Sequence, residues 1–598
     1  MADKLFEPLG FAKSTKTIIF AIAILNQMGF VKKNISSILL AVFVIIAVLV
    51  FYSPMYAYQE GLQIFMFNGE FFVDTCLRPG GLSDYVGCFF VQFFMYPHLT
   101  ALILTALVVS VQLMLKDVFI RNGCSERASE MLGVMCALGM VAAVASFNVM
   151  FGGCVAVLIA VAAAKLAVVV ENKVFLAVLT PVIYFVSGGW CCLIYIAALT
   201  VKSLPKKDFV SPAVNIVLLA FSWLIVKRIM QDDSLYGTFT GVDFNRYPDK
   251  SCAVWYVSAV IIIMCIALSK MGTLLEKNIV RVAGYIVAGI GVIVYMTTKY
   301  DAASMLDYKL DRMVRYKQWD KIVSTMQGKK STTNFAQCYL NLALNELGVL
   351  DKKMFDFVQV GAEGLVSSKI DSQDKSICNS EVYFRLGLFN ISERLTGEAM
   401  ESINTFQKSA RLYKRLAEIA LVTQQHELAM RYLKKLQATI YYRAWAKRAE
   451  QYLNAPAHTE ALADWKIKPL TMKNDVFYTP STGAYFLYNL LVNNPHSVKV
   501  LNYFVAYLML DKNISKLHEF LTQSRSEDDM GICVYEAVIL HLFINNKEEF
   551  NKIMTENNDL TRRFADFCNF MSSGGAQNPQ KAKELYGKTY WFYYYFCN

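Results

Sequence analysis

The chain has 598 residues, 59 Lys and Arg, 48 Asp and Glu, and a hydrophobic content of 55%. This composition excludes a disordered or collagen-like protein, because such chains are polar or carry glycine at a fixed period. The charge is unevenly distributed: residues 1–300 hold 22 basic and 16 acidic side chains, whereas residues 301–598 hold 37 and 32. Neither half is basic enough for a nucleic-acid partner to be expected.

The first half is too apolar for a soluble domain. It predicts a transmembrane helix bundle over residues 36–300, after a cytoplasmic or interfacial N-terminus over 1–35. A span needs about 20 mostly apolar residues, because every backbone polar group must be satisfied inside the bilayer. Segments of that kind are expected at about 37–56, 97–115, 130–148, 151–170, 210–229, 253–270 and 280–298.

The stretch 174–201 is also apolar, but Pro181 and the pair Gly188-Gly189 interrupt it. Lysine and arginine mark cytoplasmic loops, and they fall here in alternate loops, which places both ends of this stretch on the cytoplasmic side. The stretch is therefore predicted to be a hairpin, and the bundle to have about nine spans. The same rule predicts a cytoplasmic N-terminus and an external C-terminal half.

The first external loop, residues 57–96, predicts two juxtamembrane helices. The first is an amphipathic helix over Tyr58–Phe72. A breaker at 78–81 ends it, and a second helix then carries a largely aromatic stripe at helical spacing. This stripe would lie in the outer membrane interface or pack on the bundle. It consists of Leu82, Tyr85, Val86, Phe89, Phe90, Phe93 and Phe94.

This loop also carries four acidic residues, Glu60, Glu70, Asp74 and Asp84, against one basic residue, Arg78. Glu60 follows the first span by a few residues, so its carboxylate is expected at the membrane edge, partly desolvated. Such a position suits a general base or a metal ligand. The alternative for each acid is a solvated carboxylate on an amphipathic helix.

The layout of a cytoplasmic N-terminus, two juxtamembrane helices in the first external loop, and an acid soon after the first span resembles the GT-C glycosyltransferases. Those enzymes transfer sugars from polyprenyl-phosphate-linked donors. The resemblance implies that Glu60, in YAYQEGLQIF, is the catalytic acid that acts as base on the acceptor hydroxyl or holds a divalent ion such as Mg or Mn, with Asp74 assisting. It covers about 300 residues by layout, and the paired acidic motif of that superfamily is absent.

The second external loop, residues 231–251, is acidic and contains Arg246 between Phe244 and Tyr247. In a glycosyltransferase, basic side chains at this membrane edge would bind the lipid phosphate and stabilise the charge on the departing oxygen. An ordinary surface loop has the same composition. The candidates for substrate or lipid-phosphate binding are Arg246, Arg228, Lys227 and Arg78.

The second half has helical periodicity throughout, so the whole chain is predicted to be all-α, with an extracytoplasmic α-solenoid after the bundle. Residues 301–453 predict tetratricopeptide-like repeats, of which 409–440 is the clearest unit; a non-repeat helical domain is the alternative. A linker-like stretch follows at 454–482, and 483–598 predicts further repeats with an aromatic C-terminal cap. Such a domain binds an acceptor or a partner protein on its concave face.

Two functions follow from these features. The first is a membrane glycosyltransferase; eukaryotic O-mannosyltransferases, which also join a GT-C bundle to tetratricopeptide repeats, are similar in layout. The second is a non-catalytic membrane scaffold for an envelope or secretion complex. The loop over residues 67–97 also resembles an uncharacterised Bacteroidota-type family of membrane proteins with helical-repeat tails. This resemblance implies a bacterial inner-membrane protein with a periplasmic C-terminal half, and it implies no activity. The sequence contains no nucleotide-binding loop, and its six histidines lack metal-ligand spacing.

Overall fold

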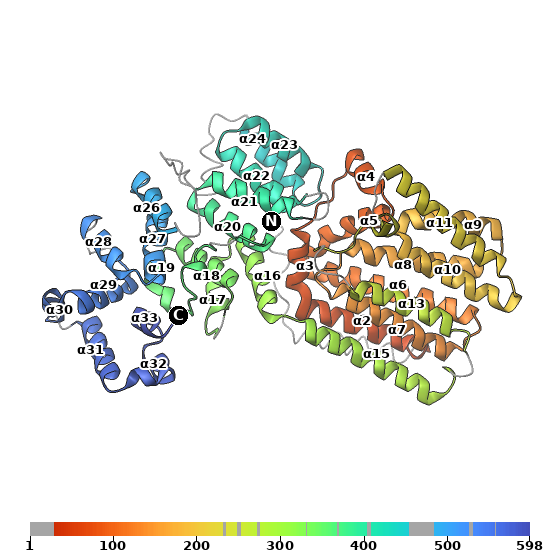
Figure 1. Cartoon of the computed structure of the whole chain (residues 1–598), viewed down its shortest axis with the longest axis horizontal. Helices are drawn as coiled ribbons and strands as arrows, with labels where there is room; N and C mark the ends of the chain where they lie inside the picture. The colour runs from red at the N-terminus through yellow and green to blue at the C-terminus, as the bar shows by residue number, and fades with distance from the viewer. Residues whose placement is uncertain are drawn as a thin grey trace. The chain divides into compact units, whose positions relative to one another are not determined.

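A computed structural model describes residues 29–597 except 231–234, 248–252, 272–274, 330–331, 368–369, 404–407, 454–482, 525–529 and 556–557. The described residues form helices joined by turns, with one isolated antiparallel bridge between Val149 and Asn245 and no strand, so the all-α prediction is confirmed (Figure 1). The predicted linker at 454–482 and most of the predicted N-terminal segment 1–35 lie outside the described residues.

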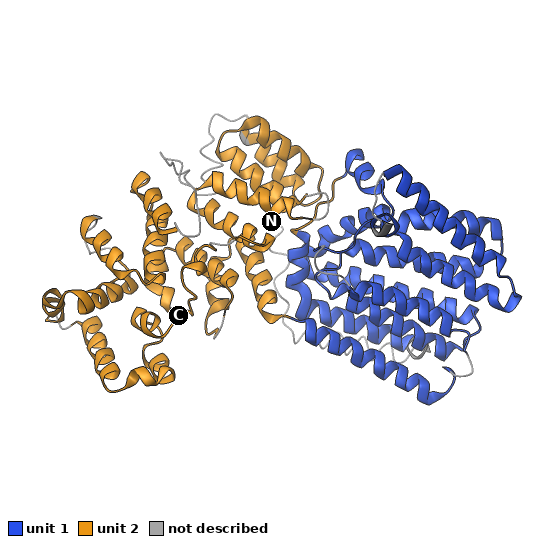
Figure 2. Ribbon diagram, in the orientation of Figure 1, with its two compact units in different colours: residues 1–60, 67–300 blue, residues 61–66, 301–598 orange. Residues whose placement is uncertain are grey.

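The chain divides into two compact units (Figure 2). The first comprises residues 1–60 and 67–300, and the second comprises residues 61–66 and 301–598. The division falls where the composition changes, near Tyr300. The short segment 61–66 is the exception, because it belongs by its contacts to the C-terminal half.

The first unit is a bundle of long apolar helices. Six of them are long and apolar enough to cross a bilayer, which makes the chain a membrane protein. The first runs from α2 (Gly29–Ile46) through a π-helical turn (Ala47–Tyr52) into α3 (Ser53–Glu60). The other five are α6 (Pro97–Arg121), α7 (Glu126–Val144), α8 (Phe151–Val169), α11 (Val210–Met230) and α15 (Asn278–Lys299).

Three shorter apolar helices complete the bundle: α9 (Lys173–Ser187), α10 (Gly189–Ser203) and α13 (Ala253–Leu268). The predicted hairpin is thus two helices joined at Gly188. This residue has φ +83°, a conformation that glycine adopts without strain. A Cβ atom there would lie 2.7 Å from the carbonyl oxygen of Thr240. The chain can therefore reverse at this point only with a residue that lacks a side chain.

The outer helices of the bundle expose apolar side chains that water would not tolerate in such number. On α11, Ile229 is 74% exposed, and on α15, Ile279 is 78% exposed. The described core of the bundle instead contains small residues on α7 and α8, which lets these helices pack closely. Lipid contact along α11 and α15 accounts for this distribution.

The predicted helix over Tyr58–Phe72 is wrong. Helix α3 ends at Glu60, the chain is non-helical through residue 68, and α4 (Gly69–Cys76) begins with the Asn68 side chain capping the amide of Phe71 at 2.9 Å. Residues 61–66 pack in the second unit. There Ser409 Oγ donates to the carbonyl oxygen of Gly61 at 2.6 Å, and Ala410 N donates to that of Gln63 at 3.3 Å. These bonds hold the segment out of a helix.

The second predicted loop helix is present as α5 (Gly81–Val91), followed by a 3₁₀ turn (Gln92–Met95). Most of its aromatic stripe is half-buried, whereas the opposite face is fully buried and made of small and polar residues. That face packs on α8: a Cβ atom on Gly87 would lie 2.5 Å from the backbone of Gly152. The helix therefore turns its polar face inward.

The second unit consists of helices that pack in antiparallel pairs. In the clearest pair, Ala417, Ala420 and Ala429 are buried where the two helices meet, as the sequence predicted. Aromatic residues of the last helix are also buried, which supports the predicted cap. The pairs are α20 (Gln373–Leu386) with α21 (Phe389–Glu401), α22 (Ala410–Val422) with α23 (His426–Gln437), α26 (Gly483–Asn493) with α27 (Val498–Leu510), and α29 (Ile532–Asn545) with α30 (Lys547–Met554).

Ion pairs are buried within the second unit. Asp311, on α16 (Ala302–Arg315), is 1% exposed and accepts two hydrogen bonds from the Arg411 guanidinium, at 2.6 and 2.8 Å. Glu381 binds both Arg385 and Arg415, which lower the pKa of its carboxyl to about 2 despite its burial. These charges stabilise the packed helices only as long as each keeps its partner.

Candidate functional site

The C-terminal end of α3 is fixed against the turn at residues 145–150. Tyr56 Oη donates to the carbonyl oxygen of Val144 at 2.8 Å, and Gln59 Nε2 donates to that of Phe147 at 3.2 Å. These bonds bury the last turn of the helix, and Glu60 is only 4% exposed. The carboxylate predicted at the membrane edge is therefore desolvated rather than free in water.

Arg246 reaches the same turn from the loop between α11 and α13. Met150 N donates to the carbonyl oxygen of Phe244 at 2.9 Å, and Arg246 N donates to that of Asn148 at 2.7 Å. The Asn148 side chain accepts a further bond from Tyr247 N at 2.7 Å. This short antiparallel contact leaves the Arg246 side chain 6% exposed.

Phe147 joins these two segments. Its carbonyl oxygen accepts from both Gln59 Nε2 and Arg246 Nε, each at 3.2 Å. The Arg246 guanidinium carbon lies 5.3 Å from the centre of the Phe147 ring, and the rings of Tyr58 and Tyr247 lie 6.2 and 5.9 Å from it. The structure thus brings the end of α3, which carries Glu60, and Arg246 to one residue.

Asp84, on α5, adds a second buried carboxyl at this end of the bundle. It is 1% exposed, and burial raises its pKa to about 6, although the Arg78 charge opposes this. Cys88 Sγ lies 3.9 Å from its Oδ1, and Oδ2 has no hydrogen-bond partner among the described residues. Burial and the Asp84 charge raise the pKa of the Cys88 thiol, and the Arg246 charge opposes this shift.

The glycines of α8 make room for this arrangement. A Cβ atom on Gly152 would lie 2.8 Å from both Cα and Oδ1 of Asp84, and one on Gly153 would lie 2.8 Å from Cβ of Phe244. Both α5 and the Arg246 segment therefore pack directly on the α8 backbone. We refer to Glu60, Asp84, Arg246 and Phe147 as the outer cluster.

The other predicted site residues lie outside the outer cluster. Asp74 is exposed on α4, and Arg78 is exposed in the turn before α5. Lys227 is half-buried and Arg228 is exposed in the last turn of α11. The described residues include no group of three or more His, Cys, Asp or Glu side chains that could hold a metal ion.

Sequence reasoning named Asp84 among the acids of the first loop but did not select it. The position of Asp84 on its predicted helix could have indicated its burial. Asp84 and Cys88 are four residues apart, and Ser83 and Gly87 flank them on the face opposite the aromatic stripe. A small and polar helix face opposite a lipid-facing one indicates burial against a neighbouring helix.

Comparison with known proteins gives one match. Residues 30–597 match the family of unknown function DUF6057. The chain belongs to this family. No curated protein and no solved structure matches it. The match spans both units, so the bundle and the helical C-terminal half are parts of one family architecture.

Proposed function

We propose that this DUF6057 protein is a membrane glycosyltransferase that transfers a sugar from a polyprenyl-phosphate-linked donor to an acceptor on the external side. One observation carries the proposal: Glu60, at the end of α3, and Arg246 are both buried, and the carbonyl oxygen of Phe147 accepts hydrogen bonds from Arg246 and from Gln59, the neighbour of Glu60 in the chain. A desolvated carboxylate and a desolvated guanidinium at a membrane edge suit proton abstraction and phosphate binding.

In the proposed reaction, Glu60 accepts the proton of the acceptor hydroxyl as its oxygen bonds to the anomeric carbon of the sugar. The bond from that carbon to the phosphate oxygen breaks, and polyprenyl phosphate leaves with the electron pair. Arg246 stabilises the charge on the leaving phosphate, with Arg228 and Lys227 attracting the lipid head group. Asp74 would orient the acceptor from the loop surface.

We further propose nine spans, with α9, α10 and α13 crossing as well. Counting each as a crossing puts Glu60, the 145–150 turn and Arg246 on one side of the membrane. The loops with Lys and Arg, around 121–127, 165–173, 202–207 and 270–281, then all lie on the other side. This distribution supports a cytoplasmic N-terminus, with the second unit in the periplasm of a bacterial inner membrane.

The experiment that tests the proposal is transfer of tritiated mannose, glucose or galactose from its polyprenyl-phosphate form in membranes that contain the full chain. Incorporation is expected with the natural chain and is expected to fall by about 100-fold in Glu60→Gln. Glu70→Gln is the matched control, because Glu70 is an exposed carboxylate of the same loop. Equal incorporation in Glu60→Gln and in the natural chain contradicts the proposal.

A non-catalytic scaffold is the second candidate function. The observation in its favour is the second unit, whose antiparallel helix pairs suit tetratricopeptide-like stacking and partner binding. In this case the bundle anchors the repeat-like unit, and no residue of the outer cluster touches a substrate. Loss of sugar transfer in Glu60→Gln would show that the protein is not only a scaffold.

A further inference from the structure

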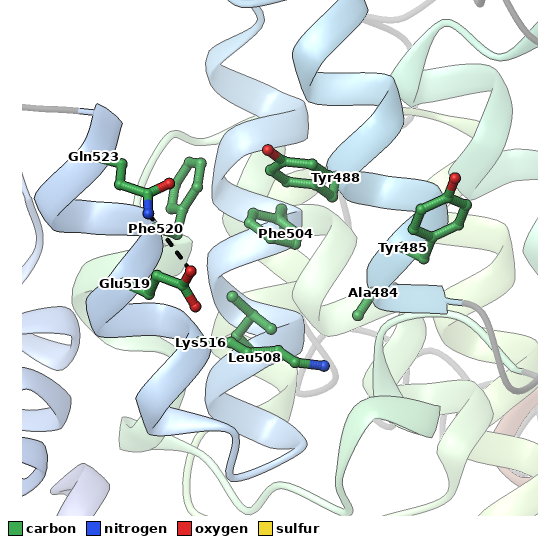
Figure 3. A pocket seen from close by; sticks show the side chains of 9 residues that line it. All are labelled: Ala484, Tyr485, Tyr488, Phe504, Leu508, Lys516, Glu519, Phe520 and Gln523. Carbon is green, nitrogen blue, oxygen red and sulfur yellow. Dashed lines mark hydrogen bonds between the residues drawn. The ribbon is translucent and has the colours of Figure 1, made fainter.

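A cavity of about 270 Å³ lies within the second unit, between α26, α27 and α28 (Ile514–Ser524). Its volume is near the lower end of the range for small-molecule pockets, about 300–1,000 Å³. Figure 3 shows Phe504 and Leu508 of α27 between the tyrosines of α26 and the polar side chains of α28. The cavity thus has an apolar floor and two different walls.

Aromatic rings cover the floor and one wall. The ring of Phe504 lies 5.8 Å from that of Tyr488 and 5.0 Å from that of Phe520, so three rings follow one another across the cavity. Phe504 is buried, whereas Tyr485 and Tyr488 are 59% and 43% exposed. Exposed tyrosines next to a buried ring offer flat apolar surface together with hydroxyl groups.

The opposite wall, on α28, is polar apart from Phe520. Glu519 and Gln523 are one helical turn apart on α28, and Gln523 Nε2 donates to Glu519 Oε1 at 3.5 Å (Figure 3). Lys516 is exposed at the edge of the cavity. This wall offers carboxylate and amide oxygens as acceptors, and an amide and an ammonium as donors, along two turns of helix.

We infer that this cavity binds the sugar ring of a glycan. A pyranose ring has an apolar C–H face, which stacks on tyrosine or phenylalanine, and a rim of hydroxyl groups that both donate and accept hydrogen bonds. The aromatic floor and the carboxylate–amide wall present these two requirements on opposite sides of one cavity. An apolar peptide side chain would leave Glu519, Gln523 and Lys516 unused, so the lining favours a polyhydroxylated ligand.

Binding of a sugar ring stands on the cavity alone. Its assignment as the site that holds the acceptor rests on the proposed function: a transferase that extends a glycan needs a site for the part of the chain already made. Under that assignment, substitutions in the cavity raise the KM for the acceptor and leave the kcat of transfer unchanged.

The test is saturation-transfer difference NMR on the full chain in detergent, with mannotriose, chitotriose and maltotriose as probes. We expect signals from at least one trisaccharide, and an affinity about ten-fold lower in Tyr488→Ala and in Glu519→Gln. Val492→Ala and Glu548→Gln are the matched controls, because both side chains are exposed and lie outside the cavity. Circular dichroism of each variant checks that the unit is folded.

Absence of signals from all three trisaccharides at millimolar concentration overturns the inference, as does binding that both cavity variants leave unchanged. Displacement of a bound trisaccharide by an apolar peptide would also overturn the preference for a glycan. The experiment distinguishes failure of this inference from failure of the proposed function. Trisaccharide binding without Glu60-dependent transfer supports the sugar site in the cavity and contradicts the transferase function. Glu60-dependent transfer without trisaccharide binding supports the transferase function and contradicts the sugar site.

Discussion

Gln59 and Arg246 donate hydrogen bonds to the same acceptor, the carbonyl oxygen of Phe147, each at 3.2 Å. One residue thereby links the end of the first membrane helix to the loop between α11 and α13. Glu60 is the next residue along the chain from Gln59, so the link also holds the backbone that carries its buried side chain. The consequences can be measured by substitution at each part of the outer cluster.

Arg246→Ala is expected to lower the thermal stability of the chain and to abolish transfer. The substitution removes a charged donor to a buried carbonyl, a loss of about 1.5–3 kcal/mol, together with the contact to the Phe147 ring. Arg246→Lys keeps the positive charge but lacks the planar guanidinium with its several N–H donors. This variant is expected to retain part of the thermal stability and little of the transfer activity. Differential scanning fluorimetry and the transfer assay measure the two effects. Full transfer with Arg246→Ala would exclude the phosphate-binding role.

Asp84 is expected to make stability depend on pH between about 4 and 6. Burial raises its pKa from 3.8 to about 6, so the folded chain holds this proton more tightly than the unfolded chain does. Stability from this group is therefore largest at low pH and falls as the pH rises through 6, a cost of up to about 3 kcal/mol at neutral pH. Asp84→Asn should remove this slope and raise the melting temperature at pH 7. Identical pH profiles for the two chains would contradict the assignment.

Gly152→Ala is expected to destabilise the bundle by about 1–3 kcal/mol, because α5 and α8 would have to separate. A Cβ atom at this position would lie 2.8 Å from Asp84. Gly289→Ala, in the membrane helix α15, is the control, since a Cβ atom there meets nothing within 4 Å. Alanine is also the better helix former, so the control should be neutral or slightly stabilising. Melting temperatures in one detergent compare the two, and equal shifts would contradict close packing at Gly152.

In the second unit, Asp311→Ala is expected to cost about 3–5 kcal/mol, because it leaves the largely buried Arg411 guanidinium without its carboxylate. The exposed pair Glu548–Lys552, at 3.3 Å, provides the comparison. Glu548→Ala is expected to change stability by less than about 1 kcal/mol, because solvent screens exposed pairs. Urea unfolding of the full chain, followed by tryptophan fluorescence, measures both. A small effect for Asp311→Ala would show that the buried pair contributes little.

The sequence predicts the six long apolar helices of the described residues, because length and hydrophobicity determine them, whereas the nine crossings stay a prediction. It could not predict the break after Glu60: Leu62, Phe65 and Met66 have helical spacing, but they are buried in a non-helical segment whose hydrogen bonds come from residues near 409. Contacts between residues so far apart in the chain override a local pattern.

The candidate site, like the fold, could be predicted from the sequence only in part. Glu60 was identified by its place after the first span, and Arg246 by its aromatic neighbours, and both are buried. The ring beside the Arg246 guanidinium is that of Phe147, which comes from a turn with no motif. Asp84 was not selected, because its burial arises from the α8 glycines rather than from its own segment. Residues whose environment comes from another helix are those that sequence reasoning misses.

The most direct test of the central claim is the glycan profile of envelope proteins in cells that carry a deletion of this chain. Mass spectrometry is applied after complementation with the natural chain, Glu60→Gln or Glu70→Gln, at equal levels in the membrane. The account predicts that glycans are lost in the deletion, return with the natural chain and with Glu70→Gln, and stay absent with Glu60→Gln. Glycans that are unchanged in both the deletion and Glu60→Gln would contradict it.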